Sequence, residues 1–152
     1  MPKELEKYIT SETSDNLPNV SVIIPVYNAE SFIAGCLERI INQSYPKEKL
    51  EILVVDNAST DRSASIIKSF PVKYLFCEKR GPSAARNLAI KAASGEYLVF
   101  IDADCLAEST LVYNHIQAHL ALRQIDPAIK AVGGGISGFN PNFWAICDDF
   151  CS

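Results

Sequence analysis

Residues 97–104 read YLVFIDAD, an apolar run of strand length that ends in two acidic residues, Asp102 and Asp104. The same order, apolar residues followed by polar ones, recurs in VSVIIPVYN (20–28) and EILVVDNASTD (51–61). Such near-continuous apolar runs, without alternation of polar side chains, are typical of strands buried on both faces by helices. The sequence therefore predicts an α/β fold with an interior parallel sheet.

Segments with helical periodicity separate the apolar runs, and this alternation is the pattern of a Rossmann-like open, mostly parallel sheet with helices on both faces. The predicted strands are Val20–Val26, Glu51–Val55, Val72–Cys77, Tyr97–Ile101 and Ile129–Val132. The predicted helices are Phe32 to Ile41, Asp61 to Ser69, Pro82 up to Gly95, and Leu111 to Leu122. We expect residues 1–17 to form a flexible tail and residues 18–152 to form one domain.

The composition is that of an ordinary globular domain: 152 residues, 48% hydrophobic and 21% charged, with a net charge of −4. An acidic balance argues against non-specific binding of nucleic acid. No apolar run approaches the roughly 20 residues that span a bilayer, and the polar N-terminus does not resemble a signal peptide. Five scattered cysteines favour free thiols. We expect a protein of the cytoplasm, or of the cytoplasmic face of a membrane.

The polar residues after each strand predict where a ligand binds. In an open parallel sheet, ligands bind outside the carboxyl ends of the strands, at the point where the strand order reverses. If the first and fourth strands are neighbours, Asn28 and the pair Asp102 and Asp104 flank one crevice. Two nearby carboxylates repel each other unless a cation lies between them, and oxygen ligands select Mg²⁺ or Mn²⁺. The alternative is that both acids are solvated turn residues.

Four ordered motifs carry a family resemblance: PVYN (25–28), VVDNASTD (54–61), GPSAARN (81–87) and FIDAD (100–104). Together they resemble the amino-terminal half of a family 2 glycosyltransferase. The resemblance implies a GT-A fold truncated at the C-terminus, without the acceptor-binding half. It also implies transfer of a sugar from a nucleoside-diphosphate donor, UDP- or GDP-linked, to an acceptor hydroxyl with inversion and with a divalent metal.

The resemblance implies donor-site roles for six residues. It assigns Pro25 and Tyr27 to the base and ribose pocket, Asp56 to the base, Arg86 to the nucleotide, Asp102 to the ribose and Asp104 to the metal that holds the diphosphate. Family members usually place a carboxylate base well downstream of the D-x-D motif. Only Asp148 and Asp149 follow near the end of this chain, and neither matches that base, so the catalytic residue stays unknown.

Three hypotheses follow for the function. The first is a glycosyltransferase of polysaccharide or glycan biosynthesis, acting on a glycan or lipid acceptor. The second is a non-catalytic nucleotide-sugar-binding remnant or partner subunit that lacks the catalytic base. The third, a nucleotidyltransferase, is disfavoured because Tyr27-Asn28-Ala29-Glu30 follows the first strand in place of a Gly- and Arg-rich loop. An exposed apolar sheet edge further predicts self-association or a partner chain.

Overall fold

The computed structural model describes residues 16–134, and the structural statements below refer to that part of the chain. Segments 1–15 and 135–152 lie outside it. Most of the predicted tail and the two late acids, Asp148 and Asp149, therefore fall outside the described residues. Leu17, placed in the tail by the sequence analysis, is buried against the core.

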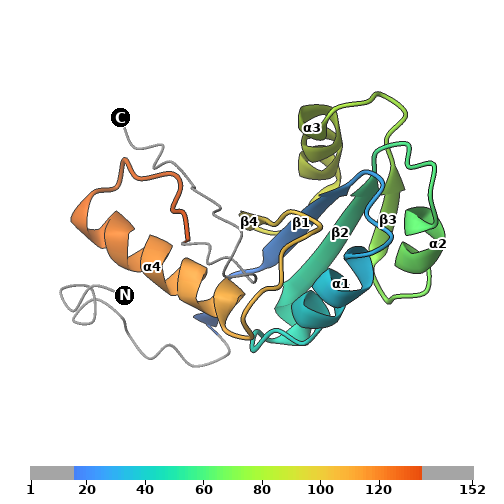
Figure 1. The fold of residues 1–152 in the computed structure, drawn as a ribbon. Helices are drawn as coiled ribbons and strands as arrows, with labels where there is room; N and C mark the ends of the chain where they lie inside the picture. The colour runs from blue at the N-terminus through green and yellow to red at the C-terminus, as the bar shows by residue number, and fades with distance from the viewer. Residues whose placement is uncertain (1–15, 135–152) are drawn as a thin grey trace, which may run out of the picture.

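Four parallel strands form one sheet in the order β3-β2-β1-β4 (Figure 1). The strands are β1 (Val20–Val26), β2 (Leu50–Asp56), β3 (Lys73–Phe76) and β4 (Tyr97–Phe100). In the register, Ile23 of β1 lies between Leu53 of β2 and Phe100 of β4. These strands confirm the first four predicted ones to within one residue at each end, and they confirm that the first and fourth strands are neighbours.

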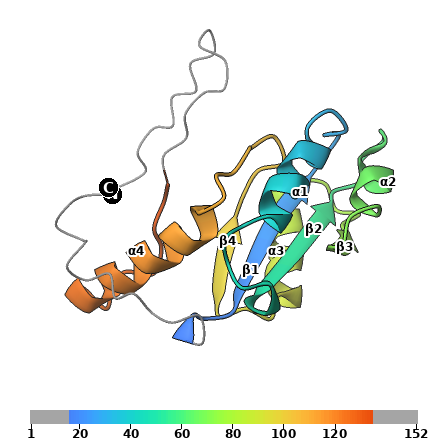
Figure 2. The ribbon, with the colours of Figure 1, turned by 90° about the horizontal axis from the view of Figure 1, so that it is seen from below.

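Helices cover both faces of this sheet, as predicted. They are α1 (Ile33–Ile41), the short η3 (Lys47–Lys49), α2 (Ser63–Ile67), α3 (Pro82–Ala92) and α4 (Leu111–Ile125). The helices α1 and α2 pack on one face and α3 packs on the other, while α4 lies beyond β4 (Figures 1 and 2). Because all four strands are parallel, their carboxyl ends meet at one edge of the sheet.

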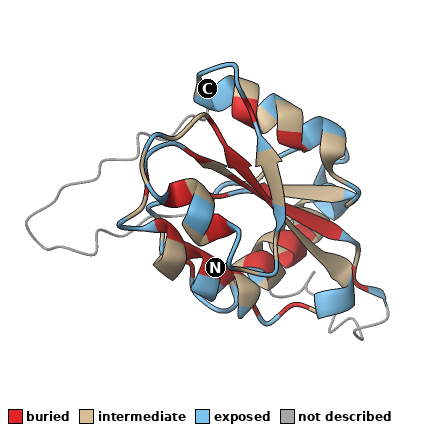
Figure 3. Ribbon diagram, turned by 90° about the vertical axis from the view of Figure 1, so that its right-hand side faces the viewer, coloured by how far each residue is buried: buried red, intermediate tan, exposed pale blue. Residues whose placement is uncertain are grey.

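The core consists of two apolar layers separated by the sheet. Val22 and Ile24 of β1 face the larger layer with α1, whereas Ile23 faces the smaller layer with α3. Burial is greatest at the centre of the sheet (Figure 3). The prediction of strands buried on both faces is correct for β1 but wrong for the outer strands, because Phe76 is 56% exposed and Phe100 is 46% exposed.

The predicted strand Ile129–Val132 is wrong. Residues 129–134 form no strand, and most of them are exposed. After α4 the chain turns at Asp126, whose carboxylate accepts a hydrogen bond from Ala128 N and whose carbonyl accepts one from Ile129 N. An apolar run becomes a strand only when a partner strand satisfies its backbone, and within the described residues β4 pairs with β1 alone.

The second helix is shorter than predicted, because it begins at Ser63 and ends at Ile67. Before its start, Asp61 Oδ1 accepts a hydrogen bond from Ser63 N at 2.9 Å. At its end, Ser69 N donates to Ile66 O, so the chain tightens into a three-residue turn before Pro71. The fourth helix is longer than predicted and ends at Ile125.

A half-buried carboxylate joins the strands at the end of the sheet opposite the strand carboxyl ends. Glu51 Oε2 accepts hydrogen bonds from Ser21 Oγ at 2.6 Å and from Ser94 N at 2.9 Å, and Glu51 Oε1 pairs with Lys73 Nζ at 3.1 Å. Partial burial raises the pKa of Glu51, but the hydrogen bonds from Ser21, Ser94 and Lys73 outweigh burial and lower the pKa to about 2. The ionised carboxylate therefore stabilises the fold.

We expect Glu51→Gln to lower the free energy of unfolding by about 2 kcal/mol at pH 7 and by much less at pH 2. The folded pKa lies below the unfolded one, so the contribution of Glu51 is complete above about pH 4.5 and is lost as the pH falls toward 2. Urea unfolding of both proteins between pH 2 and 7 measures this, with Glu38→Gln on the exposed face of α1 as the control. Parallel pH curves for wild type and Glu51→Gln would contradict the prediction.

Candidate functional site

A pocket lies at the carboxyl ends of β1, β2 and β4, next to the start of α3. It is lined by Pro25, Val26, Tyr27, Asn57, Pro82, Arg86 and Asp102. The structure thus brings together four of the six residues predicted from the sequence: Pro25, Tyr27, Arg86 and Asp102. The position agrees with the crevice expected between the first and fourth strands.

An aromatic side chain, that of Tyr27, lines one side of the pocket. Tyr27, the residue after β1, is 50% exposed. The guanidinium of Arg80 lies over its ring, 5.4 Å from the centroid, which is a cation–π arrangement. A half-exposed aromatic ring at the mouth of a pocket offers a flat apolar surface on which a base or sugar ring can stack.

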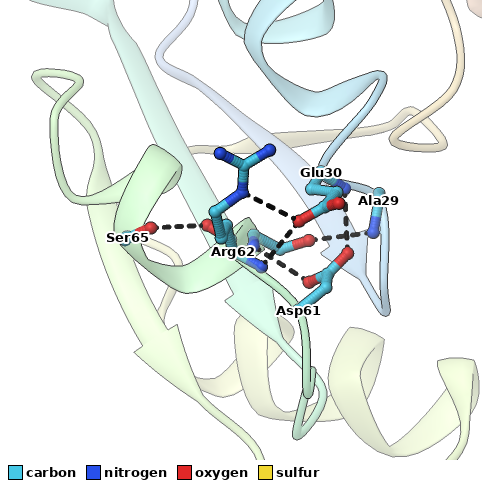
Figure 4. A network of polar contacts seen from close by, with 6 residues as sticks. Ala29, Glu30, Asp61, Arg62 and Ser65 are labelled. Atoms are coloured by element: carbon cyan, nitrogen blue, oxygen red, sulfur yellow. Dashed lines mark hydrogen bonds and ion pairs between the residues drawn. The ribbon is translucent and has the colours of Figure 1, made fainter.

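The loop that carries Tyr27 is fixed by residues 61–63, at the start of α2 (Figure 4). Ala29 N donates to Ser63 Oγ at 2.8 Å, and Glu30 N donates to Asp61 Oδ2 at 3.0 Å. In return, Arg62 N and Nε both donate to Glu30 Oε2. The two loops therefore hold each other through a network of side-chain to backbone hydrogen bonds.

Two residues in these loops have left-handed backbone conformations, Asn28 with φ 49° and Ala58 with φ 59°. Asn28 tolerates this region, and its Oδ1 accepts a hydrogen bond from Thr60 N at 2.8 Å. Ala58 has no polar side chain to support it, so its conformation is maintained by the surrounding network. Ser59, Thr60 and Asp61 all bond to the loop after β1. The sequence alone did not predict this role, because a motif does not show which loop its residues contact.

Asp56 lies behind the pocket, not on its surface. The residue is 2% exposed. Its Oδ1 accepts a hydrogen bond from Ser59 N at 2.9 Å, and its Oδ2 accepts one from Tyr74 Oη at 3.0 Å. Burial and the adjacent Asp56 carboxylate raise the pKa of Tyr74 to about 12, so the phenol stays a donor at neutral pH. Both oxygens of Asp56 thus have partners within the protein.

Asn57 lines the pocket where the sequence analysis had placed its neighbour. Successive residues of an extended chain point to opposite sides. A shift of one residue along the strand therefore decides which of Asp56 and Asn57 faces the pocket. The motif DNAS alone does not settle that choice. Val26 and Pro82 are the other lining residues that sequence reasoning did not single out, although they belong to the PVYN and GPSAARN motifs.

Arg86 and Asp102 close the side of the pocket near β4. Arg86 Nη2 lies 2.9 Å from Asp102 Oδ1, so an ion pair joins the first turns of α3 to the residues after β4. The Arg86 side chain is 36% exposed and that of Asp102 is 63% exposed. An exposed pair of this kind contributes little to stability, and both groups remain accessible to a polar ligand.

Asp104 is exposed and lies outside the pocket lining, two residues after Asp102. Its charge is felt by the buried thiol of Cys36: burial raises the pKa of Cys36 to about 12, with further contributions from Cys105, Asp104 and Asp102. The two carboxylates therefore make a locally acidic edge beside the pocket.

These carboxylates fit a divalent ion whose coordination shell is completed by water and by the phosphates of a bound ligand. Among residues 16–134, no group of three or more His, Cys, Asp or Glu side chains forms a protein cage for a metal. Mg²⁺ and Mn²⁺ commonly bind through one or two carboxylates together with water and substrate phosphates. Asp104, with its exposed carboxylate, and Asp102 supply such a donor set.

Across the described part of the chain, no helix is both long and apolar enough to cross a bilayer. The longest helix, α4, has 15 residues and carries Arg123 in its last turn.

Comparisons with known proteins identify glycosyltransferases as relatives of this chain. A glycosyltransferase of Methanococcus voltae, dolichyl N-acetyl-alpha-D-glucosaminyl phosphate 3-beta-D-2,3-diacetamido-2,3-dideoxy-beta-D-glucuronosyltransferase, is 35% identical over 133 residues, which are 83% of this chain and 41% of that protein. The crystal structure of Staphylococcus aureus TarS in complex with UDP-GlcNAc matches with a TM-score of 0.61 and 33% identity, over 66% of this chain and 32% of that one.

A second solved structure, the mannosyltransferase PcManGT of Pyrobaculum calidifontis in complex with GDP-Man and Mn²⁺, also gives a TM-score of 0.61. It is 31% identical over 75% of this chain and 37% of its own. The chain thus spans less than half the length of each of these three relatives. The neighbours share the GT-A fold, and the family model for glycosyl transferase family 2 matches residues 21–147. The parallel sheet and the pocket at its edge are consistent with this match, which covers most of the sequence. The chain therefore belongs to glycosyl transferase family 2.

Proposed function

We propose that this chain binds the donor of a metal-assisted, inverting glycosyltransferase that moves a sugar from a UDP- or GDP-sugar to an acceptor hydroxyl. The observation that carries the proposal is the pocket between the ends of β1 and β4, which joins Tyr27, Arg86 and Asp102 in a member of this family. Solved relatives hold UDP-GlcNAc in one case and GDP-Man with Mn²⁺ in another.

Each wall of the pocket suits a different part of a nucleotide sugar. Pro25 and the exposed Tyr27 ring offer apolar contact to the base and ribose. Asp102 accepts hydrogen bonds and suits the ribose hydroxyls, while Arg86 provides a cation for the nucleotide. For Asp56 to recognise the base directly, Ser59 or Tyr74 would have to release one of its oxygens.

Asp104, with Asp102 beside it, is the proposed ligand set for Mg²⁺ or Mn²⁺. When bound, the ion neutralises the diphosphate and stabilises the leaving nucleoside diphosphate. Without a cation, Asp56, Asp102 and Asp104 would repel the negatively charged donor. Arg86 cannot compensate for all three, because it is already paired with Asp102. The carboxylates therefore define a site that favours donor and metal together.

The reaction itself replaces the bond between the anomeric carbon and the diphosphate by a bond to the acceptor oxygen. The acceptor hydroxyl attacks from the face opposite the leaving group, which inverts the configuration, and its proton passes to a base. No residue is assigned as that base. We propose a glycan or lipid acceptor, and a cytoplasmic location in which Cys36 and Cys77 remain the free thiols that they are in the structure.

Calorimetric titration of UDP and then GDP into the purified chain, with Mn²⁺ and again with chelator, tests the proposal. We expect one nucleotide to bind in Mn²⁺ and to bind more weakly with chelator. Release of the nucleoside diphosphate from the matching nucleotide sugar, assayed in the same samples, would support catalysis. Binding without release would favour a non-catalytic nucleotide-sugar-binding subunit, and no binding by the folded chain would overturn the proposal.

A further inference from the structure

Asn57 makes three hydrogen bonds to one segment of backbone, the loop between β3 and α3. Its Nδ2 donates to Cys77 O at 3.1 Å and to Lys79 O at 2.7 Å, and its Oδ1 accepts from Gly81 N at 2.7 Å. The residue is 4% exposed. Its side chain therefore joins the end of β2 to the whole loop from 77 to 81.

The pattern requires an asparagine. Two backbone carbonyls face Nδ2, so both of its hydrogens are used, and a backbone N–H faces Oδ1. An aspartate at this position would turn an oxygen toward Cys77 O and Lys79 O and would repel them. Alanine would remove the Asn57 partner from all three backbone groups and would leave Lys79 O with only the weak thiol donor of Cys77.

The loop held by Asn57 leads directly into the helix that forms one wall of the pocket. Gly81 has φ 121°, a conformation open to glycine, and it precedes Pro82 at the first position of α3. Pro82 and Arg86 then line the pocket. A shift of the Gly81 backbone would move both side chains relative to Tyr27 across the pocket.

We propose that Asn57 is a positioning residue of the donor site, which sets the shape of the pocket by holding the 77–81 loop and, through Gly81, the start of α3. This inference rests on the proposed function for its nucleotide readout. It assigns Asn57 an indirect role, since its amide is occupied by protein partners while its side chain borders the pocket.

Hydrogen exchange and nucleotide titration of Asn57→Ala and Asn57→Asp test the proposal. With Asn57→Ala, the Gly81 amide loses its acceptor, so its exchange should quicken at least tenfold and the affinity for UDP or GDP in Mn²⁺ should fall about fivefold. With Asn57→Asp, burial and the two facing carbonyls raise the pKa of the introduced carboxyl above its ordinary value. The loss of nucleotide affinity, relative to wild type at each pH, should therefore shrink as the pH falls from 8 to 5, because the protonated carboxyl again donates to Lys79 O.

Asn42→Asp is the matched control. Its Nδ2 also donates to a backbone carbonyl, that of Glu38 at 2.9 Å, at the end of α1 and outside the pocket lining. We expect this variant to keep wild-type affinity and wild-type exchange at Gly81.

Three results would overturn the proposal. Lower affinity with unchanged Gly81 exchange would mean that Asn57 contacts the nucleotide directly. Faster exchange with unchanged affinity would mean that the loop does not shape the pocket, and an Asn57→Asp defect independent of pH would exclude the lost donor as the cause. If wild type binds neither nucleotide, the proposed function fails, whereas the exchange of Gly81 still reports whether Asn57 holds the loop.

Discussion

Asp104→Ala is expected to weaken the binding of UDP or GDP in Mn²⁺ about 30-fold, which corresponds to about 2 kcal/mol. Asp104 is the exposed carboxylate of the acidic pair, whereas Asp102 shares its charge with Arg86 at 2.9 Å. Removing the Asp104 carboxylate leaves the proposed ion with only the carboxylate of Asp102, which is already paired with Arg86. Calorimetric titration with and without chelator measures the effect, and in chelator the variant should bind as weakly as wild type.

Two further variants separate charge from general damage to the protein. Asp104→Asn keeps the shape of the side chain but removes its charge, so it should lose most of the metal-dependent affinity. Asp126→Ala removes an exposed aspartate at the end of α4, outside the pocket lining, and should keep wild-type affinity. Equal loss in the Asp104 and Asp126 variants, or metal-dependent binding by Asp104→Ala, would contradict the assignment.

The centre of the fold could be predicted because hydrophobic burial determines it. The β1 residues Val20 to Val26 are almost all buried, and a continuous apolar run bounded by polar residues is the sequence pattern of such a strand. Placing Tyr27 and Asp102 on one edge of the sheet then followed from parallel topology alone. The donor-site roles of Pro25, Tyr27, Arg86 and Asp102 were implied by the family resemblance, and the structure places all four around one pocket.

The rest depends on contacts between residues distant in sequence. Ile129–Val132 has the apolar character of a strand, but Asp126 turns the chain and within the described residues no strand pairs with it. Which of Asp56 and Asn57 faces the pocket is decided by the backbone direction at the end of β2. Neither the segment that a loop contacts nor the side of the chain to which one residue points produces a periodic pattern in the sequence.

The start of β4 shows another contact of this kind, made by a residue that has no side chain. Gly95 lies against β1, where its N–H donates to Ser21 Oγ at 2.9 Å. A Cβ atom at this position would lie 2.5 Å from Ser21 N, 2.7 Å from Val20 C and 2.8 Å from Ser21 Oγ. Two of these atoms belong to the backbone of the central strand, which cannot move without disturbing its pairing with β2 and β4.

Gly95→Ala is therefore expected to lower the free energy of unfolding by about 3 kcal/mol and the midpoint of thermal unfolding by roughly 10 °C. The clash separates β4 from β1 and also strains the hydrogen bonds that join Ser21, Ser94 and Glu51. Thermal and urea unfolding followed by circular dichroism measure the loss. Gly133→Ala, where a Cβ meets nothing within 4 Å, is the control and should unfold like wild type, whereas equal stability of Gly95→Ala and wild type would show that β1 and β4 tolerate a wider separation than this packing implies.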